Sequence, residues 1–153
     1  MSDKILIREV RRGDLSRWKP LWEGYNAFYG RKAKTALPDT ITNMTWSRFF
    51  DAYEPMRALV AERSGQLLGL AHFLFHRSTI ALESTCYLQD LFTVESARGK
   101  GVGRGLIEEV CRRAEYAGCS RLYWLTHQTN ATAMNLYDKV AEKSGFIVYR
   151  KAL

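Results

Sequence analysis

The sequence lacks the features that mark membrane, secreted and zinc-binding proteins. Its 153 residues include no run of about 18 apolar residues, the length that crosses a bilayer. It has only three cysteines, Cys86, Cys111 and Cys119, and none forms a Cys-x-x-Cys pair. Neither a disulfide framework nor a zinc site is therefore indicated. The opening segment MSDKILIREVRRGD carries charges where a signal peptide needs apolar residues, so we expect a cytoplasmic protein.

The chain is too short for two hydrophobic cores. With 153 residues and 46% hydrophobic content, it has enough apolar side chains for one compact unit. No internal repeat or low-complexity tract divides it. We predict a single domain over residues 1–153.

Positive charge is in excess, with 23 Lys and Arg against 16 Asp and Glu, a formal net charge of +7. Such an excess favours an anionic ligand, nucleic acid or an acidic surface as a partner. A positive surface also simply keeps a small protein soluble. No recognised nucleic-acid-binding motif accompanies the charge.

Hydrophobic periodicity predicts that strands and helices are mixed along the chain. The expected strands cover residues 4–10, 57–63, 67–77, 85–94, 121–126 and 145–151, with a hairpin turn at residues 64–66. The expected helices cover residues 14–29, 44–53, 102–117 and 130–143, and residues 31–43 are expected to form a loop. This order predicts one mixed α/β sheet with helices on its faces.

The segment ARGKGVGRGL places a glycine at every second position between a predicted strand and a predicted helix. In such a turn, backbone N–H groups converge on an anion at the positive end of the helix dipole, and glycine lets a phosphate approach closely. A nucleotide P-loop requires Ser or Thr directly after its lysine, and Lys100 is followed by neither. The Gly-x-Gly-x-Gly spacing also fits a dinucleotide fingerprint poorly. A pyrophosphate of another kind is indicated.

Two motifs resemble the GNAT superfamily of N-acetyltransferases. The segment from Arg98 to Gly103 is similar to the family pattern Arg/Gln-x-x-Gly-x-Gly/Ala, which binds acetyl-CoA. Asn130, Ala133 and Leu136-Tyr137, followed by Gly145-Phe146, resemble the family's Asn-x-x-Ala-x-x-Leu-Tyr helix and its Gly-Phe ending. The resemblance implies a GNAT-like mixed, mostly antiparallel sheet, splayed at its central strands, with helices on both faces. It also implies acetyl-CoA as cosubstrate and transfer of an acetyl group to a primary amine.

The resemblance assigns binding roles to one strand, one turn and one helix. The predicted cofactor-binding residues are Leu91, Phe92, Thr93, Arg98, Gly99, Lys100, Gly101, Val102, Gly103, Arg104 and Asn130. Backbone groups of the strand would pair with the pantetheine arm, and one N–H near Leu91 or Phe92 would bind the thioester carbonyl. Tyr137 lies seven residues after Asn130, on the same helix face, and would point at the sulfur.

The general base is not settled by the sequence. Polyamine acetyltransferases of the superfamily resemble the segment YLQDLF but carry Glu-Asp where this chain has Gln89-Asp90. Gln89 cannot act as a base, whereas Asp90, Glu83 or a chain of waters could. Alternation along the strand predicts that Asp90 faces away from Gln89. We name Asp90 and Tyr137 as the candidate catalytic residues.

The acceptor is expected to be a primary amine of a small molecule or of a lysine or peptide. Aromatic residues of the first two helices, Trp18, Trp22, Tyr25, Phe28, Tyr29 and Trp46, would form one wall of its pocket, although most of them are core by their spacing. His72, His76 and His127 lack the neighbours of a metal site, and no metal is expected. The segment LYDKVAEKSGFIVYRK resembles a histone- or polyamine-type subgroup that often dimerises through its C-terminal strands. The alternatives are a CoA-binding regulatory module without chemistry and a basic nucleic-acid-binding protein.

Overall fold

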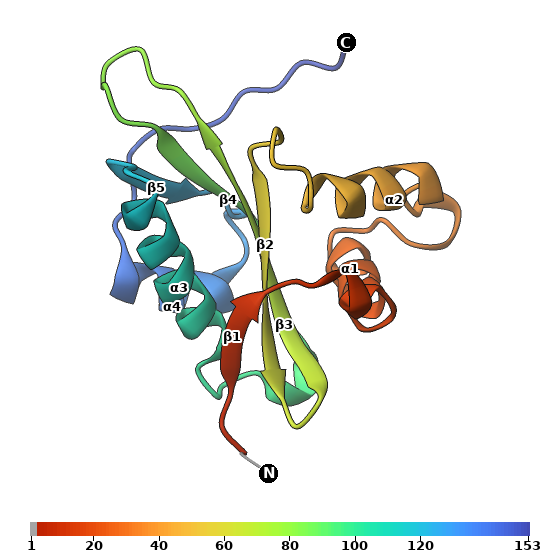
Figure 1. The fold of residues 1–153 in the computed structure, drawn as a ribbon. Coiled ribbons are helices and arrows are strands. Elements are labelled where there is room, and N and C mark those ends of the chain that lie inside the picture. Colours follow the sequence, from red (N-terminus) through yellow and green to blue (C-terminus); the bar gives the residue numbers. More distant parts are fainter. Residues whose placement is uncertain (1–2) are drawn as a thin grey trace.

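The computed structural model describes residues 3–153, in which strands and helices are mixed as the sequence predicts (Figure 1). The strands are β1 (Leu6–Glu9), β2 (Met56–Arg63), β3 (Gln66–His76), β4 (Thr85–Thr93) and β5 (Arg121–Trp124). The helices are α1 (Leu15–Phe28), α2 (Asp39–Arg48), α3 (Val102–Tyr116) and α4 (Ala131–Val140). Short 3-10 turns occupy Arg12–Asp14, Ala33–Thr35 and Glu95–Ala97.

Within residues 3–153, the strands form a five-stranded sheet in the order β1-β2-β3-β4-β5. Neighbours are antiparallel from β1 to β4, while β5 is parallel to β4. Parallel neighbours need a crossover connection, and α3 provides it. The mostly antiparallel mixed sheet expected from the sequence is confirmed.

Helices cover both faces of the sheet, as Figure 1 shows. One face is covered by α3, which buries an apolar stripe at helical spacing, Val102, Leu106, Val110 and Ala114. The opposite face is covered by α1 and α2, which pack aromatic side chains against β2 and β3, including Trp18, Trp22 and Trp46. None of the helices in residues 3–153 has the length and apolar character needed to span a membrane.

Two predicted elements differ from the structure. The segment predicted as a loop up to residue 43 already contains the start of α2, which begins at Asp39 and ends at Arg48. Pro38 precedes the helix and Asp39 supplies an acidic side chain to its first turn, both of which favour a helix start. Reading this polar stretch as a loop was therefore wrong.

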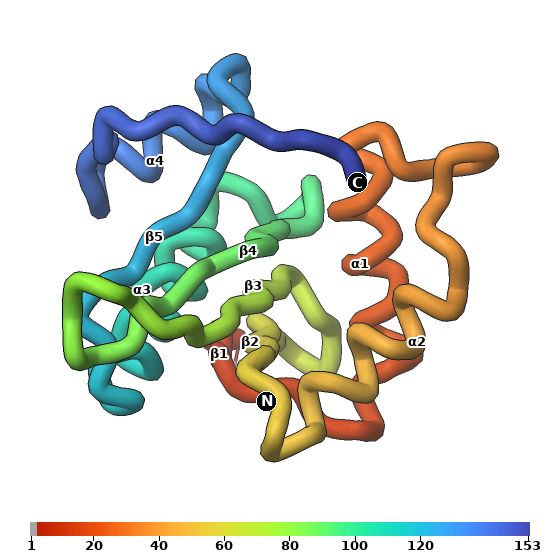
Figure 2. The backbone as a smooth tube through the Cα atoms, turned by 90° about the horizontal axis from the view of Figure 1, so that it is seen from above, coloured from red at the N-terminus to blue at the C-terminus, as the bar shows by residue number. Residues whose placement is uncertain are grey.

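The closing strand predicted at residues 145–151 is also absent from the described chain. After α4 ends at Val140, the last residues run past the end of the sheet toward the α1 side (Figure 2). A strand needs a partner for its backbone groups, and this segment lies against none. Its apolar side chains are exposed, among them Phe146, Ile147, Val148 and Tyr149.

Candidate functional site

The sheet opens between β4 and β5. These strands pair only from Thr85↔Arg121 to Leu88↔Trp124, and β5 then ends. The second half of β4, from Gln89 to Thr93, therefore has β3 on one side and no strand on the other. The splayed sheet implied by the family resemblance is present, and it leaves a backbone edge free inside the fold.

A bulge lies at the point where β4 leaves β5. Asp90 pairs with His72 and Leu88 pairs with Phe73, so Gln89 is an extra residue in β4. Leu88 packs into the core beneath α3, whereas Asp90 contacts His72, which packs against Trp18 on the α1 side. Strict alternation, on which the predicted direction of Asp90 was based, does not hold across the bulge.

The open edge presents the backbone of Leu91 and Thr93. Val94 N–H donates to Leu68 on β3 at 2.9 Å, and the carbonyl oxygen of Phe92 points toward Gly69 on the same strand. Backbone groups of successive strand residues point to opposite sides, so Leu91 and Thr93 face the open side. Thr93 O accepts a bond from Arg98 Nε at 3.2 Å, while the N–H of Leu91 faces the open side, where no strand of the described chain lies next to it.

The glycine-rich turn leads from β4 into α3. Gly99 and Gly101 have φ of 75° and 81°, in the left-handed region that favours glycine. Within the described chain, no backbone carbonyl or side chain accepts a hydrogen bond from the N–H groups of residues 99–104. These N–H groups, at the positive end of α3, form a concentrated donor site for an anion.

The basic side chains of the turn differ in whether they already have a partner in the protein. Arg98 bonds to Thr93 O, and Arg104 pairs with Glu108 one helical turn further along α3. Lys100 is exposed. The donor groups and the cations together form a site whose chemistry suits a pyrophosphate.

Close packing holds α3 and its turn against the sheet. A Cβ added at Gly69 would lie 2.8 Å from Phe92 O and 2.9 Å from Val102 Cγ1. One added at Gly105 would lie 2.8 Å from Ile7 Cδ1. Both glycines therefore allow the start of α3 to lie directly on β3 and β1, which fixes the turn beside the open edge of β4.

A narrow pocket lies at the opening between the strands. It encloses about 270 Å³ including its mouth. Its lining comes from α1, β4, β5 and α4, and comprises Tyr25, Tyr29, Leu88, Gln89, Leu91, Trp124, Leu125 and Tyr137. The pocket thus joins the free edge of β4 to three tyrosines from two helices.

Tyr137 and Asn130 lie at opposite ends of α4. Asn130 precedes the helix, and its side-chain amide donates to Thr126 Oγ1 at 3.4 Å. The Tyr137 ring packs edge-on against Trp124, with centroids 5.5 Å apart. Burial, with a smaller effect of Tyr29, raises the pKa of Tyr137 to about 12, so its hydroxyl stays protonated at neutral pH.

Asp90 belongs to a buried hydrogen-bond network that sequence reasoning missed. The indole N–H of Trp18 donates to His72 Nε2 at 3.0 Å, and His72 Nδ1 lies 2.9 Å from Asp90 Oδ2. An indole can only donate, so Nε2 must be the accepting nitrogen and Nδ1 carries the proton that bonds Asp90. His72 is thereby held in one tautomer, and its bond holds Asp90 in place.

Tyr25 connects this network to the pocket. Burial first, and then the charge and hydrogen bonding of Asp90, raise the pKa of the Tyr25 hydroxyl well above its usual value. Tyr25 lines the pocket, whereas Asp90 lies behind it and is only 8% exposed. Asp90 therefore reaches the pocket through the Tyr25 hydroxyl.

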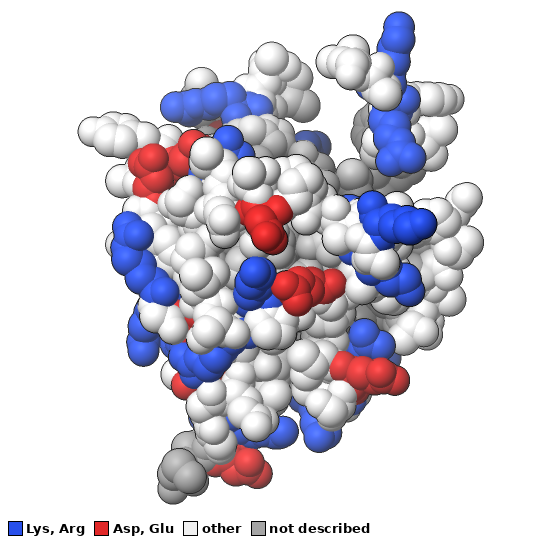
Figure 3. All heavy atoms as spheres, turned by 90° about the vertical axis from the view of Figure 1, so that its right-hand side faces the viewer, with Lys and Arg blue, Asp and Glu red and all other residues white. Residues whose placement is uncertain are grey.

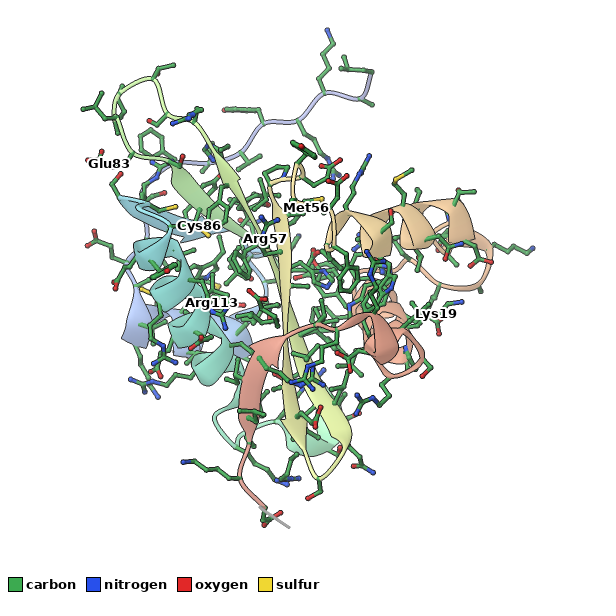
Figure 4. All side chains as sticks on the ribbon, in the orientation of Figure 1. Lys19, Met56, Arg57, Glu83, Cys86 and Arg113 are labelled. Atoms are coloured by element: carbon green, nitrogen blue, oxygen red, sulfur yellow. The ribbon has the colours of Figure 1, made fainter. Side chains whose placement is uncertain are left out.

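Other candidates from the sequence lie elsewhere. Glu83, an alternative base, is exposed in the loop between β3 and β4, outside the pocket lining (Figure 4). His127 bonds to Thr129 Oγ1 at 2.6 Å in an exposed loop, and His76 bonds to Tyr123 Oη at 3.0 Å. Across residues 3–153, no three His, Cys, Asp or Glu side chains gather into a group that could hold a metal ion.

The outer surface of α1 offers no comparable chemistry among the described residues. A wider hollow lies over the first half of α1, where Lys19 and Glu23 line it, but neither glycine turn nor strand edge reaches it. Figure 4 shows Lys19 on the outer side of α1, away from the sheet. On the side of α1 and α2, basic and acidic side chains are interspersed, so the positive charge forms no continuous basic surface on that side (Figure 3).

Comparison with known proteins agrees with this geometry. The acetyltransferase (GNAT) family profile matches residues 18–141. The D-amino-acid N-acetyltransferase HPA3 of Saccharomyces cerevisiae is 35% identical over 153 residues, covering 99% of this chain and 92% of the yeast protein.

Solved structures share the fold. An integron cassette protein from V. cholerae has a TM-score of 0.78 at 25% identity, over 97% of this chain and 92% of its own. The aminoglycoside N-acetyltransferase AAC(6')-Iy, solved with CoA, has a TM-score of 0.83 at 17% identity, over 99% and 97% of the two chains. The chain belongs to the acetyltransferase (GNAT) family and is an acetyl-CoA-dependent N-acetyltransferase.

Proposed function

We propose that this enzyme acetylates the primary amine of a small molecule by direct attack of the amine on acetyl-CoA, with both substrates bound together. One observation carries the proposal. The free N–H groups of residues 99–104, the open edge of β4 and the tyrosine-lined pocket follow one another along a single path. An anionic, extended molecule bound along that path would bring its far end to the pocket.

The residues present fit acetyl-CoA, which would supply the activated acetyl group. The turn at residues 99–104 would hold the pyrophosphate, with Arg98 and Lys100 adding charge. The exposed backbone of Leu91 and Thr93 would pair with the amide groups of the pantetheine arm, as an added strand would. Asn130, at the start of α4, would contact the same arm from the other side of the opening.

We assign proton removal to Asp90 acting through Tyr25. A primary amine has a pKa of about 10 and must lose a proton before it can attack. Tyr25 lines the pocket and its hydroxyl interacts with Asp90, and its raised pKa keeps it neutral, so it can pass a proton without becoming charged. His72 and Trp18 position the carboxylate and do not touch the substrate.

Two donors would stabilise negative charge during transfer. Leu91 lines the pocket, and its N–H, on the open side of β4, can donate to the carbonyl oxygen of the acetyl group as that oxygen gains charge. The Tyr137 hydroxyl can donate to the departing sulfur. The thiol of CoA has a pKa of about 8.5, like cysteine. Tyr137, with its pKa of about 12, is then a hydrogen-bond donor to the thiolate rather than an efficient proton source.

A small acceptor is favoured over a protein. The pocket is narrow, and Tyr25 of α1 and Tyr29, directly after that helix, line it. The yeast relative is described as acting on D-amino acids, which are small primary amines.

We further propose that two chains pair through their C-terminal segments. Phe146, Ile147, Val148 and Tyr149 are between 67% and 89% exposed, an unusual run of apolar side chains for a free surface. Sedimentation analysis checks this, and a monomer at all concentrations contradicts it. The cytoplasmic location expected from the charged N-terminal sequence remains a prediction for cell fractionation.

Calorimetry with acetyl-CoA, followed by thiol release with a panel of amines, tests the proposed function. Binding of acetyl-CoA together with amine-dependent thiol release supports it. Binding without thiol release for any amine, amino acid or lysine peptide would point to a regulatory module instead. Absence of binding would remove the assignment of the turn.

A further inference from the structure

Arg31 and Asp90 place opposite charges near Tyr25, one of the tyrosines that line the pocket. We propose that Arg31 binds the carboxylate of the acceptor, so that the enzyme selects amines that carry a neighbouring carboxylate, that is, free amino acids. This inference rests on the proposed function and adds a specificity residue to it. The sequence motifs give no indication of Arg31, which lies just beyond the end of α1.

The Arg31 side chain is fixed in position by Asn26. Its Nε donates to Asn26 Oδ1 at 2.6 Å, and its backbone N–H donates to Asn26 O at 2.9 Å. Asn26 is itself buried and donates from Nδ2 to Trp22 O at 2.9 Å. Gly30, with φ of 81°, turns the chain so that both bonds form. A cation held in this way loses little rotamer freedom when it binds a ligand.

The guanidinium of Arg31 lies over the rings that line the pocket. Its central carbon is 5.5 Å from the Tyr29 centroid and 5.8 Å from the Tyr25 centroid. Only Nε is engaged, because the two terminal nitrogens have no hydrogen bond or ion pair to any of residues 3–153. A guanidinium with both terminal nitrogens free matches the two oxygens of a carboxylate.

The negative charge near Arg31 is that of Asp90, which also acts on Tyr25. Both charges act on the Tyr25 hydroxyl, Asp90 raising its pKa and Arg31 lowering it, so both lie near that side of the pocket. An amino acid carries its own two charges a few ångströms apart. With its carboxylate on Arg31, its amine would lie toward Tyr25 and the open edge of β4. An amine without a carboxylate would meet Arg31 as an uncompensated positive charge, which disfavours polyamines.

The test compares an amino acid with the same molecule lacking its carboxylate. Steady-state kinetics would use D-phenylalanine, L-phenylalanine and phenethylamine as acceptors at saturating acetyl-CoA. The variants are Arg31→Gln, Arg31→Lys and Arg12→Gln. The last is a matched control, because Arg12 also lies over an aromatic ring, Phe50 at 4.8 Å, but that ring, unlike Tyr25 and Tyr29, does not line the pocket.

We expect the wild-type enzyme to prefer at least one phenylalanine enantiomer to phenethylamine. Arg31→Gln should raise KM for that amino acid by about 10- to 100-fold, the usual worth of a hydrogen-bonded charge pair. Its effect on phenethylamine should be small or favourable. Arg31→Lys should recover part of the loss, and Arg12→Gln should match the wild type. Acetyl-CoA affinity of Arg31→Gln should be unchanged, and its thermal unfolding should shift by no more than the loss of the bond to Asn26 explains.

Two results overturn the inference and can be told apart. If phenethylamine and the amino acids are acetylated equally well, or if Arg31→Gln weakens them equally, Arg31 does not bind a carboxylate and the proposed function stands. If the wild-type enzyme releases thiol with none of the acceptors, the proposed function fails and the inference with it.

Discussion

The two faces of the sheet differ in whether their polar groups come from the backbone or from buried side chains. Beneath α3 the core is apolar, and the donors for an anion come from the backbone of residues 99–104. Beneath α1 and α2 the core contains buried polar side chains, among them Asp14, Asn26, Thr42, His72 and Asp90. Each of these polar groups has a hydrogen-bond partner. The opening between β4 and β5 is where the two faces meet.

This difference separates binding of the cofactor, which is the same in every reaction, from selection of the acceptor. A backbone site requires small residues and one local conformation, and in the proposed function it would recognise only the phosphate and amide groups that every acetyl-CoA offers. The side-chain site depends on the identity of each residue in a network, so one substitution changes the acceptor or the chemistry. We therefore expect changes on the α3 side to act on cofactor affinity and changes on the α1 side to act on turnover and acceptor choice.

The largest effect is expected for Asp90→Asn, on the α1 side. The amide still accepts the bond from His72 but cannot take a proton, so kcat should fall about 10²- to 10³-fold, as for loss of a general base. Acetyl-CoA affinity, measured by calorimetry, should not change. Asp138→Asn is the control, because Asp138 is an exposed neighbour of Tyr137 with the same charge. A wild-type rate in Asp90→Asn would exclude Asp90 as the base.

The next effect belongs to the α3 side. Gly101→Val adds a side chain at φ of 81° and fills the approach to the N–H groups, so acetyl-CoA Kd should rise about 100-fold, equal to about one or two charged hydrogen bonds. Gly118→Val serves as control, because Gly118 ends the same helix with φ of 83° and has open space around it. Equal Kd values for the two variants would mean that strain, rather than a blocked anion site, explains any loss.

The same contrast explains which parts could be read from the sequence. The turn was predictable because a backbone site depends on residues that are adjacent in the sequence. Here these are the glycines and cations between a strand and a helix. The family motif then located Asn130 and Tyr137, of which Tyr137 lines the pocket. The hairpin was predictable for the same reason, since Ser64 and Gly65 both adopt positive φ at its turn.

The polar network could not be read in this way. Trp18, His72 and Asp90 come from three elements far apart in the sequence, and only the sheet register brings them together. The bulge at Gln89 also shifts the alternation of β4, so a period of two gives no guide to Asp90. The strand predicted for the C-terminal segment was wrong for another reason. Its composition favours a strand, but no neighbouring strand is available to receive its hydrogen bonds within the described chain.

A smaller effect is expected for Tyr137, which lines the pocket at the opening where the two faces of the sheet meet. Tyr137→Phe removes one hydrogen bond to a developing thiolate, so kcat should fall roughly 10-fold while acetyl-CoA affinity changes little. Tyr116→Phe is the control, because Tyr116 is 95% exposed at the end of α3. Single-turnover kinetics should show the loss in the chemical step. An unchanged rate in Tyr137→Phe would remove its hydroxyl from the mechanism.

The smallest effect concerns how α1 is anchored. Asp14, at its start, receives hydrogen bonds from Arg8 of β1 at 2.8 and 3.0 Å, and Arg8 also pairs with Glu62. The bonds from Arg8, which outweigh desolvation, lower the pKa of Asp14 from 3.8 to about 2. The folded state therefore gains stability from the charged carboxylate above pH ~4, and loses it as the pH falls toward 2.

The acid-dependent part of this stability should be about 1–2 kcal/mol, measured by urea unfolding at pH 6, 4 and 3. In Asp14→Asn that part should disappear, leaving a variant that is less stable than the wild type at pH 6 and closer to it at pH 3. Among residues 3–153, the buried residues of the core beneath α3 are apolar and include no such pair, so acid should weaken the α1 side first. Tryptophan fluorescence can follow that side, because Trp18, Trp22 and Trp46 lie there. Parallel loss of stability in both proteins down to pH 3 would mean that Asp14 does not anchor α1 through its charge.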